Sequence, residues 1–283
     1  MLSENKVKEL KKFSKQIQIE TVKMIASLGV GHLGGSLSIA DALAVLYGEQ
    51  MKYDPKNPKW AGRDWFICSK GHAGPAVYSA LALKQFFPMS ELKTLNRPGT
   101  KLPSHCDRLK TPGIDMTTGS LGQGSSTAAG IALAHKMNHM DNRIYLMLGD
   151  GEIDEGQVWE MALFTGTQKL TNLIAFVDCN KLQLDGPTCE ICDVGNVAQK
   201  FEDFGWYAQS VDGHDVVAIN EAIEKAKAQH EKPSMIVLNT EKAHGWTMFA
   251  NKIGSHSTTI SADQLEDALR EMNAAMKSIE EGK

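Results

Sequence analysis

The sequence has 283 residues, of which 42% are hydrophobic and 23% charged, and its formal net charge is -4 at pH 7. This composition is typical of a globular protein, and the length does not require more than one large domain. The negative charge gives no support for nucleic-acid binding, and no apolar run reaches the roughly 20 residues that span a bilayer. We therefore expect a single domain over residues 1–283, without a nucleic-acid or membrane partner.

The cysteines and the N-terminal segment bear on the compartment. The first residues lack the apolar core of a signal peptide, and the chain has five cysteines, an odd number. Reduced thiols are typical of cytoplasmic proteins, so we expect a cytoplasmic location. Cys189 and Cys192 form an isolated CxxC motif, which we interpret as ordinary thiols because no second pair could complete a zinc site.

The first half of the chain is predicted to be mainly helical. An amphipathic helix should end at Gly29, and Ser36 or Ser38 can cap the helix that follows the glycine-rich segment 31–35. The first expected elements are a helix at 6–28, a helix from the serine caps to about Gln50, and a strand at 64–68. The segment 69–75 should open a helix that ends at Phe86. A loop at 95–116 and an alanine-rich helix ending near Met140 should follow.

Two apolar runs and the helix between them organise the second half. The runs at 144–148 and 173–177 are short, continuously apolar and bounded by turn residues, as is typical of strands buried on both faces. Residues 155–169 have helical spacing and enough length for a crossover between parallel strands. The sequence therefore predicts an α/β fold with a parallel sheet and helices on both faces.

The remaining elements follow this central unit. They are a loop at 182–195, a short helix, strands at 207–211 and 233–238, a helix capped by Asp215 and a terminal helix from Ser261.

Polar residues follow both central strands. Asp150 lies between Gly149 and Gly151 after the first strand, and Asn180 follows the second. Parallel strands place their carboxyl ends at one sheet edge, where open α/β sheets bind ligands. A carboxylate and an amide oxygen suit Mg²⁺ or Ca²⁺ whose other ligands are phosphate oxygens and water, and glycine lets the backbone approach such a ligand. This pattern predicts a metal-diphosphate site.

These residues carry a family resemblance. Gly149-Asp150-Gly151, Glu155-Gly156 and the segment 178–182 (DCNKL) resemble the thiamin diphosphate motif, and the variant GDGxxxEGxxWE with a later DxNxxxxDG is similar to transketolases. The resemblance covers nearly the whole chain but only the first half of a full-length transketolase. It implies the thiamin diphosphate-binding fold of the PP type.

The histidines form two groups. Four lie in Gly/Ser/Pro-rich segments and suggest loops that converge on a polar cleft, where imidazoles exchange protons with sugar hydroxyls; they are His32, His72, His105 and His256. Four others are interpreted as structural or solvated: His135 and His139 on an exposed helix face, His214 in a turn and His230 in a charged stretch.

The resemblance implies roles for these residues. His32, His72, His105 and His256 match the family's catalytic histidines, although Leu33, Lys70 and Cys106 depart from the family segments around them, and His244 lies close to the last match. Further site residues are implied by the motifs TTGxLGQG and GDGxxxEG and by the metal site: Gly119, Leu121 and Gly122 against the cofactor, His72 and Gly151 as further cofactor contacts, Glu155 facing a glutamate of the partner, and Asp150, Asn180 and the backbone of Leu182 on the metal.

The resemblance also implies the reaction and the assembly. Thiamin diphosphate with Mg²⁺, or Ca²⁺ or Mn²⁺, would support transfer of a two-carbon ketol unit from a ketose, most simply a sugar phosphate of the pentose phosphate pathway, to an aldose. The chain ends after the helix that follows the first domain. We therefore expect one half of a split enzyme, completed by a separate pyrimidine-binding C-terminal chain, with two copies of each chain in the assembly.

Three alternatives remain open. A split transketolase for a sulfonated or branched ketose has the same first half, and the alpha chain of a 2-oxo acid dehydrogenase shares the cofactor motif. The four-histidine pattern and TTGSLGQG favour the transketolase. Retention of these histidines and Glu155 also argues against a non-catalytic homologue.

Overall fold

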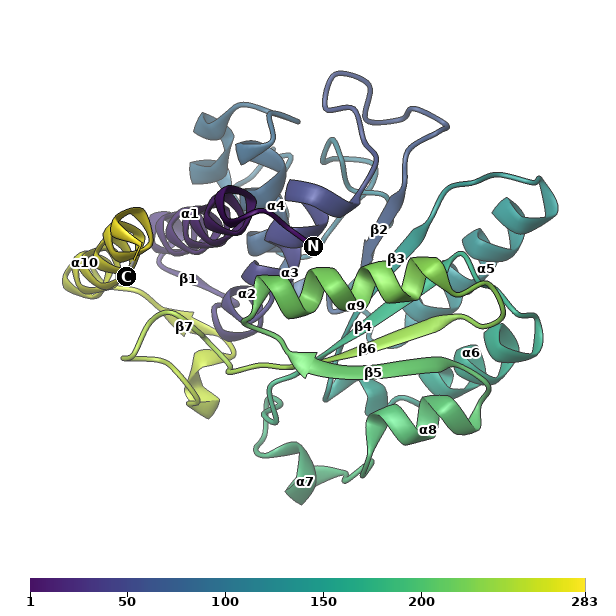
Figure 1. Cartoon of the computed structure of the whole chain (residues 1–283). Coiled ribbons are helices and arrows are strands. Elements are labelled where there is room, and N and C mark those ends of the chain that lie inside the picture. The colour runs from purple at the N-terminus through teal and green to yellow at the C-terminus, as the bar shows by residue number, and fades with distance from the viewer. Residues whose placement is uncertain (283) are drawn as a thin grey trace.

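The computed structural model describes residues 1–282, and its centre is a parallel sheet with the strand order β2-β3-β4-β6-β5 (Figure 1). All four neighbouring pairs of strands in this sheet are parallel. The strands are β2 (Trp65–Cys68), β3 (Ile144–Gly149), β4 (Leu173–Cys179), β5 (Tyr207–Asp212) and β6 (Ser234–Asn239). The predicted α/β fold and the positions of these strands are therefore confirmed.

Side chains of the central strands alternate between two hydrophobic clusters, one on each face of the sheet. Tyr145 and Met147 pack into the cluster under α1 (Glu4–Leu28), α3 (Ala40–Val45), α4 (Gly74–Leu83) and α9 (Val216–Ala228). Ile144 and Leu146 pack into the cluster under α5 (Gln123–Met137), α6 (Gly156–Thr167) and α8 (Val197–Asp203). Burying such a side chain stabilises a fold by about 1.5–3 kcal/mol, so β3 and β4 form the rigid centre on which the loops depend.

The helix expected from the serine caps to about Gln50 is instead broken into pieces. The structure has α2 (Gly34–Leu37), then α3, then a π-helical turn (Leu46–Gln50). Ser36 donates through Oγ to the His32 carbonyl at 2.7 Å, and Ser38 donates through Oγ to Asp178 at 2.7 Å. Neither serine is the N-cap of a helix, because the N-caps of α2 and α3 are Leu33 and Ile39.

Three predicted helices end earlier than expected, each for the same physical reason. A non-glycine residue with positive φ follows each helix: Gln85 (φ 67°) after α4, His139 (φ 53°) after α5 and Lys169 (φ 48°) after α6. The left-handed conformation stops a helix, and glycine is its usual sign in a sequence. The expected ends at Phe86, Met140 and Lys169 were therefore too late.

Two short strands were not predicted. β1 (Val30–Gly31) pairs antiparallel with β7 (Thr258–Thr259), and Gly31 lies opposite Thr258. Strands of two residues have no detectable period in a sequence. The pair joins the start of the chain to its last part.

The terminal helix was predicted correctly. α10 (Ala262–Glu281) starts after the N-cap Ser261, which forms a capping box with Gln264, and it packs along α1 (Figure 1). The Lys8 ammonium donates to the Glu280 carbonyl at 2.6 Å. The two ends of the described chain are thus held together.

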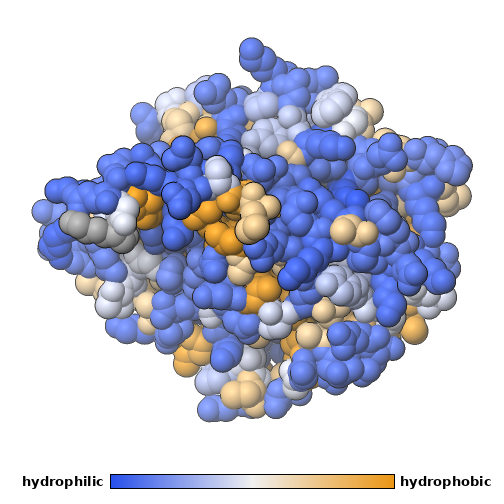
Figure 2. All heavy atoms as spheres, in the orientation of Figure 1, coloured by the Kyte–Doolittle hydropathy of each residue, from blue (hydrophilic) through white to orange (hydrophobic). Residues whose placement is uncertain are grey.

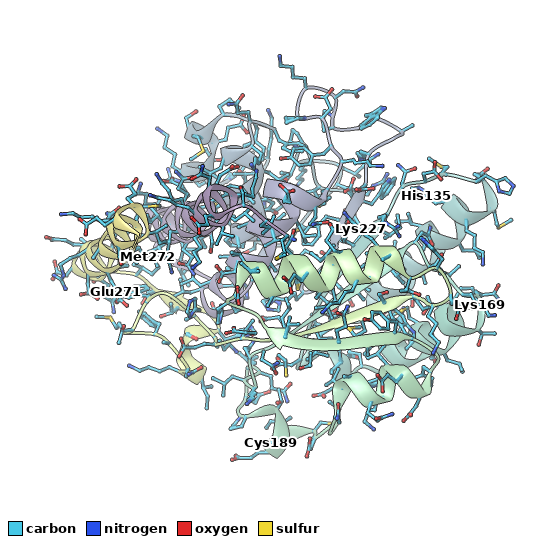
Figure 3. The ribbon with its side chains drawn as sticks, in the orientation of Figure 1. His135, Lys169, Cys189, Lys227, Glu271 and Met272 are labelled. Atoms are coloured by element: carbon cyan, nitrogen blue, oxygen red, sulfur yellow. The ribbon has the colours of Figure 1, made fainter. Side chains whose placement is uncertain are left out.

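A histidine and two cysteines lie outside the sheet edge, and Figure 3 labels His135 and Cys189. His135 was expected to be exposed, but it is 7% exposed and its ring lies 5.6 Å from Trp65, because α5 turns this position toward the start of β2. Cys189 and Cys192, at α7 (Thr188–Ile191), are exposed free thiols.

The surface gives no sign of a membrane span. In the face drawn in Figure 2, hydrophilic side chains predominate and hydrophobic ones form small, separate groups. Within residues 1–282, no helix combines the length and the apolar character needed to cross a bilayer.

Candidate active site

The carboxyl ends of β3 and β4 form the floor of a cavity of about 250 Å³. Gly149 of β3 lies opposite Asp178 of β4, so the two following segments emerge at the same edge. Asp150 and Asn180 are both 6% exposed and both line the cavity. The structure therefore brings together the two side chains that the sequence placed in a metal-diphosphate site.

Asp150 is held by backbone amides, and within residues 1–282 it forms no ion pair. Its oxygens accept from the Gly151 amide at 2.9 Å and from the Lys181 amide. Lys181 adopts the left-handed conformation (φ 65°), which turns its amide toward Asp150. Burial, together with the nearby charge of Asp178, raises the pKa of Asp150 to about 7. A bound divalent cation would favour the ionised carboxylate, so this position fits a metal ligand.

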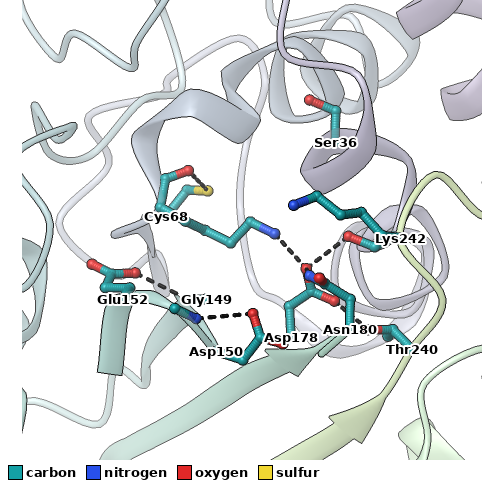
Figure 4. Close-up of polar contacts among 12 residues, drawn as sticks. Ser36, Cys68, Gly149, Asp150, Glu152, Asp178, Asn180, Thr240 and Lys242 are labelled. Atoms are coloured by element: carbon teal, nitrogen blue, oxygen red, sulfur yellow. Dashed lines mark hydrogen bonds and ion pairs between the residues drawn. The ribbon is translucent and has the colours of Figure 1, made fainter. Parts of the chain in front are cut away.

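The amide of Asn180 has a fixed orientation (Figure 4). Its Nδ2 donates to Asp178 Oδ2 at 2.9 Å, and its Oδ1 accepts from the Leu182 amide at 3.2 Å. Asp178 is fully buried and also accepts from Lys70 at 2.5 Å, from Ser38 and from Thr240. Because the amide nitrogen binds Asp178, the oxygen of Asn180 is the atom available to a hard cation.

The third expected metal ligand, the Leu182 carbonyl, accepts from the Lys242 ammonium at 2.8 Å. Burial and the nearby Lys70 lower the pKa of Lys242 to about 8. A cation on this carbonyl would have to displace the ammonium, which could then bind a phosphate oxygen. The donor set of Asp150, Asn180 and Leu182 thus fits a hard divalent cation with phosphate ligands.

The cavity also has room for an anion, because glycines let the protein backbone come close to a bound group. A methyl group on Gly35 would lie 3.2 Å from both His72 Nε2 and Lys70 Nζ, which is closer than an ordinary contact, so the glycine keeps this space open. Gly119 has a φ of +141°, and a methyl group there would lie 2.8 Å from His105 Cδ2. Two lysines and two glycine positions therefore shape a place that a diphosphate could fill.

The four histidines of the Gly/Ser/Pro-rich segments line this same cavity. The ring centroid of His32 lies 5.5 Å from that of His72, 5.4 Å from that of His105 and 5.6 Å from that of His256, and the His72 and His256 rings are 5.0 Å apart. The expected convergence of the loops is thus observed. His32 follows β1 and His256 precedes β7, so the small sheet holds this pair together.

Burial lowers the pKa of each of the four imidazoles. The pKa of His72 is lowered most by burial and next by the nearby charge of Lys70. Burial and the charge of Lys242 lower the pKa of His256 to about 4. Each ring is therefore mainly neutral near pH 7. A neutral imidazole has one donor and one acceptor nitrogen, which suits it to hydroxyl groups.

His244, the other histidine near the C-terminal match, lies outside the cavity. Its ring stacks on that of His214 with centroids 3.6 Å apart, and its Nδ1 is 3.2 Å from Glu241. His214 contacts Asp41 through Nδ1 at 3.0 Å and accepts through Nε2 from the Glu241 amide, in keeping with a structural role. The geometry therefore favours His256 over His244 as the fourth histidine of the cavity.

The expected cofactor-facing residues differ in position. Gly119, Leu121 and Gly151 line the cavity. Gly122 lies just behind them with a φ of +82° and begins α5 as its N-cap. Glu155 is exposed at the start of α6, outside the cavity lining. Its place on the surface leaves it free to face another chain.

Sequence reasoning missed three charged residues of the cavity. Lys70, Glu152 and Lys242 all line it, and Lys70 and Lys242 are almost fully buried. Lys242 follows the carboxyl end of β6, the same sheet edge as Asp150, so its position after a predicted strand was the signal available. Glu152 lies directly after the Gly-Asp-Gly triplet, where nothing in the sequence distinguishes it from an ordinary turn residue.

A family model described as "Transketolase, thiamine diphosphate binding domain" matches residues 10–277. The chain belongs to this transketolase family. The match confirms the predicted resemblance and supports thiamin diphosphate as the cofactor of the site.

Relatives include short chains as well as full-length enzymes. The 6-deoxy-6-sulfo-D-fructose transketolase subunit SqwG of Clostridium sp. (strain MSTE9) is 54% identical over 89% of this chain and 92% of its own. An apulose-4-phosphate transketolase subunit of Phocaeicola vulgatus is 33% identical, with 92% of both chains covered. Transketolase 1 of Escherichia coli is 36% identical, but only 39% of its length is covered.

A solved structure agrees with this pattern. Transketolase from Campylobacter jejuni superposes with a TM-score of 0.88 at 31% identity, covering 93% of this chain and 42% of the other. The chain is thus a transketolase-type transferase subunit that corresponds to the cofactor-binding half of full-length enzymes.

Proposed function

We propose that the chain is the diphosphate-binding subunit of a two-chain transketolase that transfers a two-carbon ketol unit from a ketose to an aldose. One observation carries this proposal: the metal-diphosphate edge with Asp150 and Asn180 and the cluster of four imidazoles line one cavity. The relatives that match over nearly their whole length are themselves named transketolase subunits. They favour this reading over the alpha chain of a 2-oxo acid dehydrogenase.

The cavity residues would divide the work of binding. Asp150, Asn180 and the Leu182 carbonyl would hold Mg²⁺, while Lys242 and Lys70 would contact phosphate oxygens. When bound, thiamin diphosphate supplies the carbanion chemistry of the reaction. Asp178 keeps the Asn180 oxygen toward the cation by binding the amide nitrogen. Ca²⁺ or Mn²⁺ would also fit a set of oxygen ligands.

The histidines would position the sugar and exchange protons with it. His32 lies within 5.6 Å, ring to ring, of the other three, so one small polyol can reach several imidazoles at once. Their lowered pKa values keep them neutral, so each can accept a hydroxyl proton at one nitrogen and return it. General acid–base groups of this kind contribute typically about 10²–10⁴-fold to a rate.

The identity of the ketose is a separate question within this proposed function. The pentose phosphate pathway stays a prediction, whereas the 54% identical relative is named for 6-deoxy-6-sulfo-D-fructose. We propose the sulfonated ketose as the first substrate to test because that identity is well above the 33–36% shared with the relatives named for apulose 4-phosphate. The cytoplasm is the proposed location, in line with five free thiols.

The partner would complete the site. Glu155 is exposed beside Gly122, where it could meet a glutamate of a pyrimidine-binding chain. Two facing carboxylates raise the pKa of one of them, so the pair would share a proton. We propose an assembly of two copies of each chain, with the active sites between the subunits.

The test is ketol transfer by this chain with and without the product of the adjacent gene. We expect activity only in the mixture, with thiamin diphosphate and Mg²⁺ present. Fructose 6-phosphate, xylulose 5-phosphate, apulose 4-phosphate and 6-deoxy-6-sulfo-D-fructose would be compared by kcat/KM. Full activity of the single chain would refute the two-chain proposal, and a preference for a sugar phosphate would refute the sulfonated substrate.

A further inference from the structure

A buried carboxylate of the cavity lining connects the loops that are expected to face the cofactor. Glu152, in the short 3₁₀ helix Glu152–Asp154, is 2% exposed. Its Oε1 accepts from Ser69 Oγ at 2.5 Å and from the Gly122 amide at 2.9 Å. Its Oε2 accepts from the Gly149 amide at 3.0 Å (Figure 4). One side chain therefore binds three segments that are far apart in the sequence.

Each of these segments carries residues of the cavity. Ser69 follows β2, directly before Lys70 and three residues before His72. The Gly122 loop carries Gly119 and Leu121, and Gly149 comes directly before Asp150; these residues line the cavity. Glu152 thus binds the three segments that carry Lys70 and His72, the glycine loop, and Asp150.

The segments are packed too closely to move independently. A methyl group on Gly71 would lie 2.7 Å from the Thr118 carbonyl carbon, and one on Gly124 would lie 2.4 Å from Ser69 Oγ. Thr118 also donates to the Cys68 carbonyl at 2.6 Å. A shift of the Glu152 contacts would therefore be transmitted to the walls of the cavity.

We propose that Glu152 is a positioning residue for the cofactor, which sets the glycine loop, the Lys70 segment and Asp150 in the arrangement that thiamin diphosphate and its cation bind. The inference rests on the proposed cofactor site and adds a determinant of affinity to it. Binding is favoured because the order of the three loops exists before the cofactor arrives.

The carboxylate is required for this role because all three partners are donors. A glutamine at this position would aim its NH₂ group at a donor whichever way the amide is turned. In one orientation the glutamine NH₂ group would face the Gly149 N–H. In the other orientation it would face the Gly122 N–H. A buried donor left without an acceptor is costly, so the loops would move apart.

The experiment measures thiamin diphosphate binding by calorimetry, with Mg²⁺, on the two-chain complex. We expect Glu152→Gln to raise the Kd by about tenfold or more while kcat at saturating cofactor changes less than about threefold. Glu202→Gln, at an exposed position of α8, is the matched control and should leave the Kd unchanged. A lowered melting temperature with an unchanged Kd would show a purely structural role and overturn the proposal.

A second variant keeps the test decisive if Glu152→Gln does not fold. Ser69→Ala removes one donor and leaves the carboxylate, and we expect a smaller rise in the Kd. In the double variant the two effects should not add, because both act through one contact. An unchanged Kd in Ser69→Ala, or strict additivity, would contradict the inference. Absence of binding by the unmodified complex would instead refute the proposed function itself.

Discussion

Gly149 of β3 is the direct neighbour of Asp178 of β4 across the sheet. This pairing sets Asp150, one residue later, beside Asn180, two residues later, although they are separated in the sequence by a whole helix. The register of two buried strands thus determines the geometry of the candidate metal site. Any change that shifts this register would separate the two ligands.

Replacing Asp150 should abolish cofactor retention. In Asp150→Asn the shape of the side chain is kept but the charge that the cation neutralises is lost, so we expect thiamin diphosphate with Mg²⁺ to bind at least about 100-fold more weakly. Calorimetry on the two-chain complex measures this. The control is Asp185→Asn, an exposed carboxylate of the following loop. Unchanged affinity in Asp150→Asn would remove Asp150 from the metal site.

His256 should act in turnover, while His244 should not. We expect His256→Ala to lower kcat on the order of 100-fold, because a proton-transfer group is lost from the cavity. His244→Ala is the matched control, since His244 stacks on His214 outside the cavity. Steady-state kinetics with saturating cofactor compares them, and calorimetry should find nearly equal cofactor affinities. A normal His256 variant with an impaired His244 variant would reverse the assignment.

His256 should also make stability depend on pH. Its pKa is lowered to about 4 in the folded state from 6.5, so the folded chain disfavours its protonated form. Stability from this group is present above about pH 6.5 and is lost as the pH falls toward 4, because the unfolded chain binds the proton first. Allowing for solvent screening, the loss at pH 5 is on the order of 1 kcal/mol.

The measurement is urea unfolding of the cofactor-free protein at pH 7.5 and pH 5. We expect the His256→Asn variant to lose less unfolding free energy between these two values than the unmodified protein does. His230→Asn, at an exposed position outside the cavity lining, serves as the control and should lose as much as the unmodified protein. An equal loss in all three proteins would contradict the lowered pKa.

Glu155 should matter for the assembled enzyme rather than for the single chain. Because its side chain is exposed at the start of α6, Glu155→Gln should leave the unfolding free energy of the single chain within about 0.5 kcal/mol. In the two-chain complex we expect slower ketol transfer. Size-exclusion chromatography with light scattering would establish whether two copies of each chain associate. Normal turnover of the variant would refute a role for Glu155 at the interface.

The sequence predicted the parts of the fold that have a period or a strong boundary signal. The continuously apolar runs of β3 and β4 identified buried parallel strands, and the residues after them identified the edge. Four histidines in glycine-rich loops identified the other side of the cavity. These features are local in sequence, so local reasoning could find them.

The missed features depend on contacts between distant segments. Ser38 resembles a helix cap, but its hydroxyl binds Asp178, 140 residues away. Glu152 resembles an ordinary residue of a turn, and only its three partners reveal its burial. His135 lies on the same face of α5 as the buried Ala128 and Ala132, and its contact with Trp65 of β2 joins segments that are far apart in the sequence. Tertiary contacts, rather than propensity, decide each of these positions.

The pairing of β1 with β7 has a consequence for synthesis of the chain. His32 leaves the ribosome early, whereas His256 and the strand that fixes it are made after the whole central sheet. The cavity therefore cannot be complete while the chain is still being translated through that sheet. Nascent chains would first acquire Asp150 and Asn180, and only much longer ones would gain the full set of imidazoles. Premature termination before Thr258 would leave a protein with the metal edge and an open, unfinished histidine cluster.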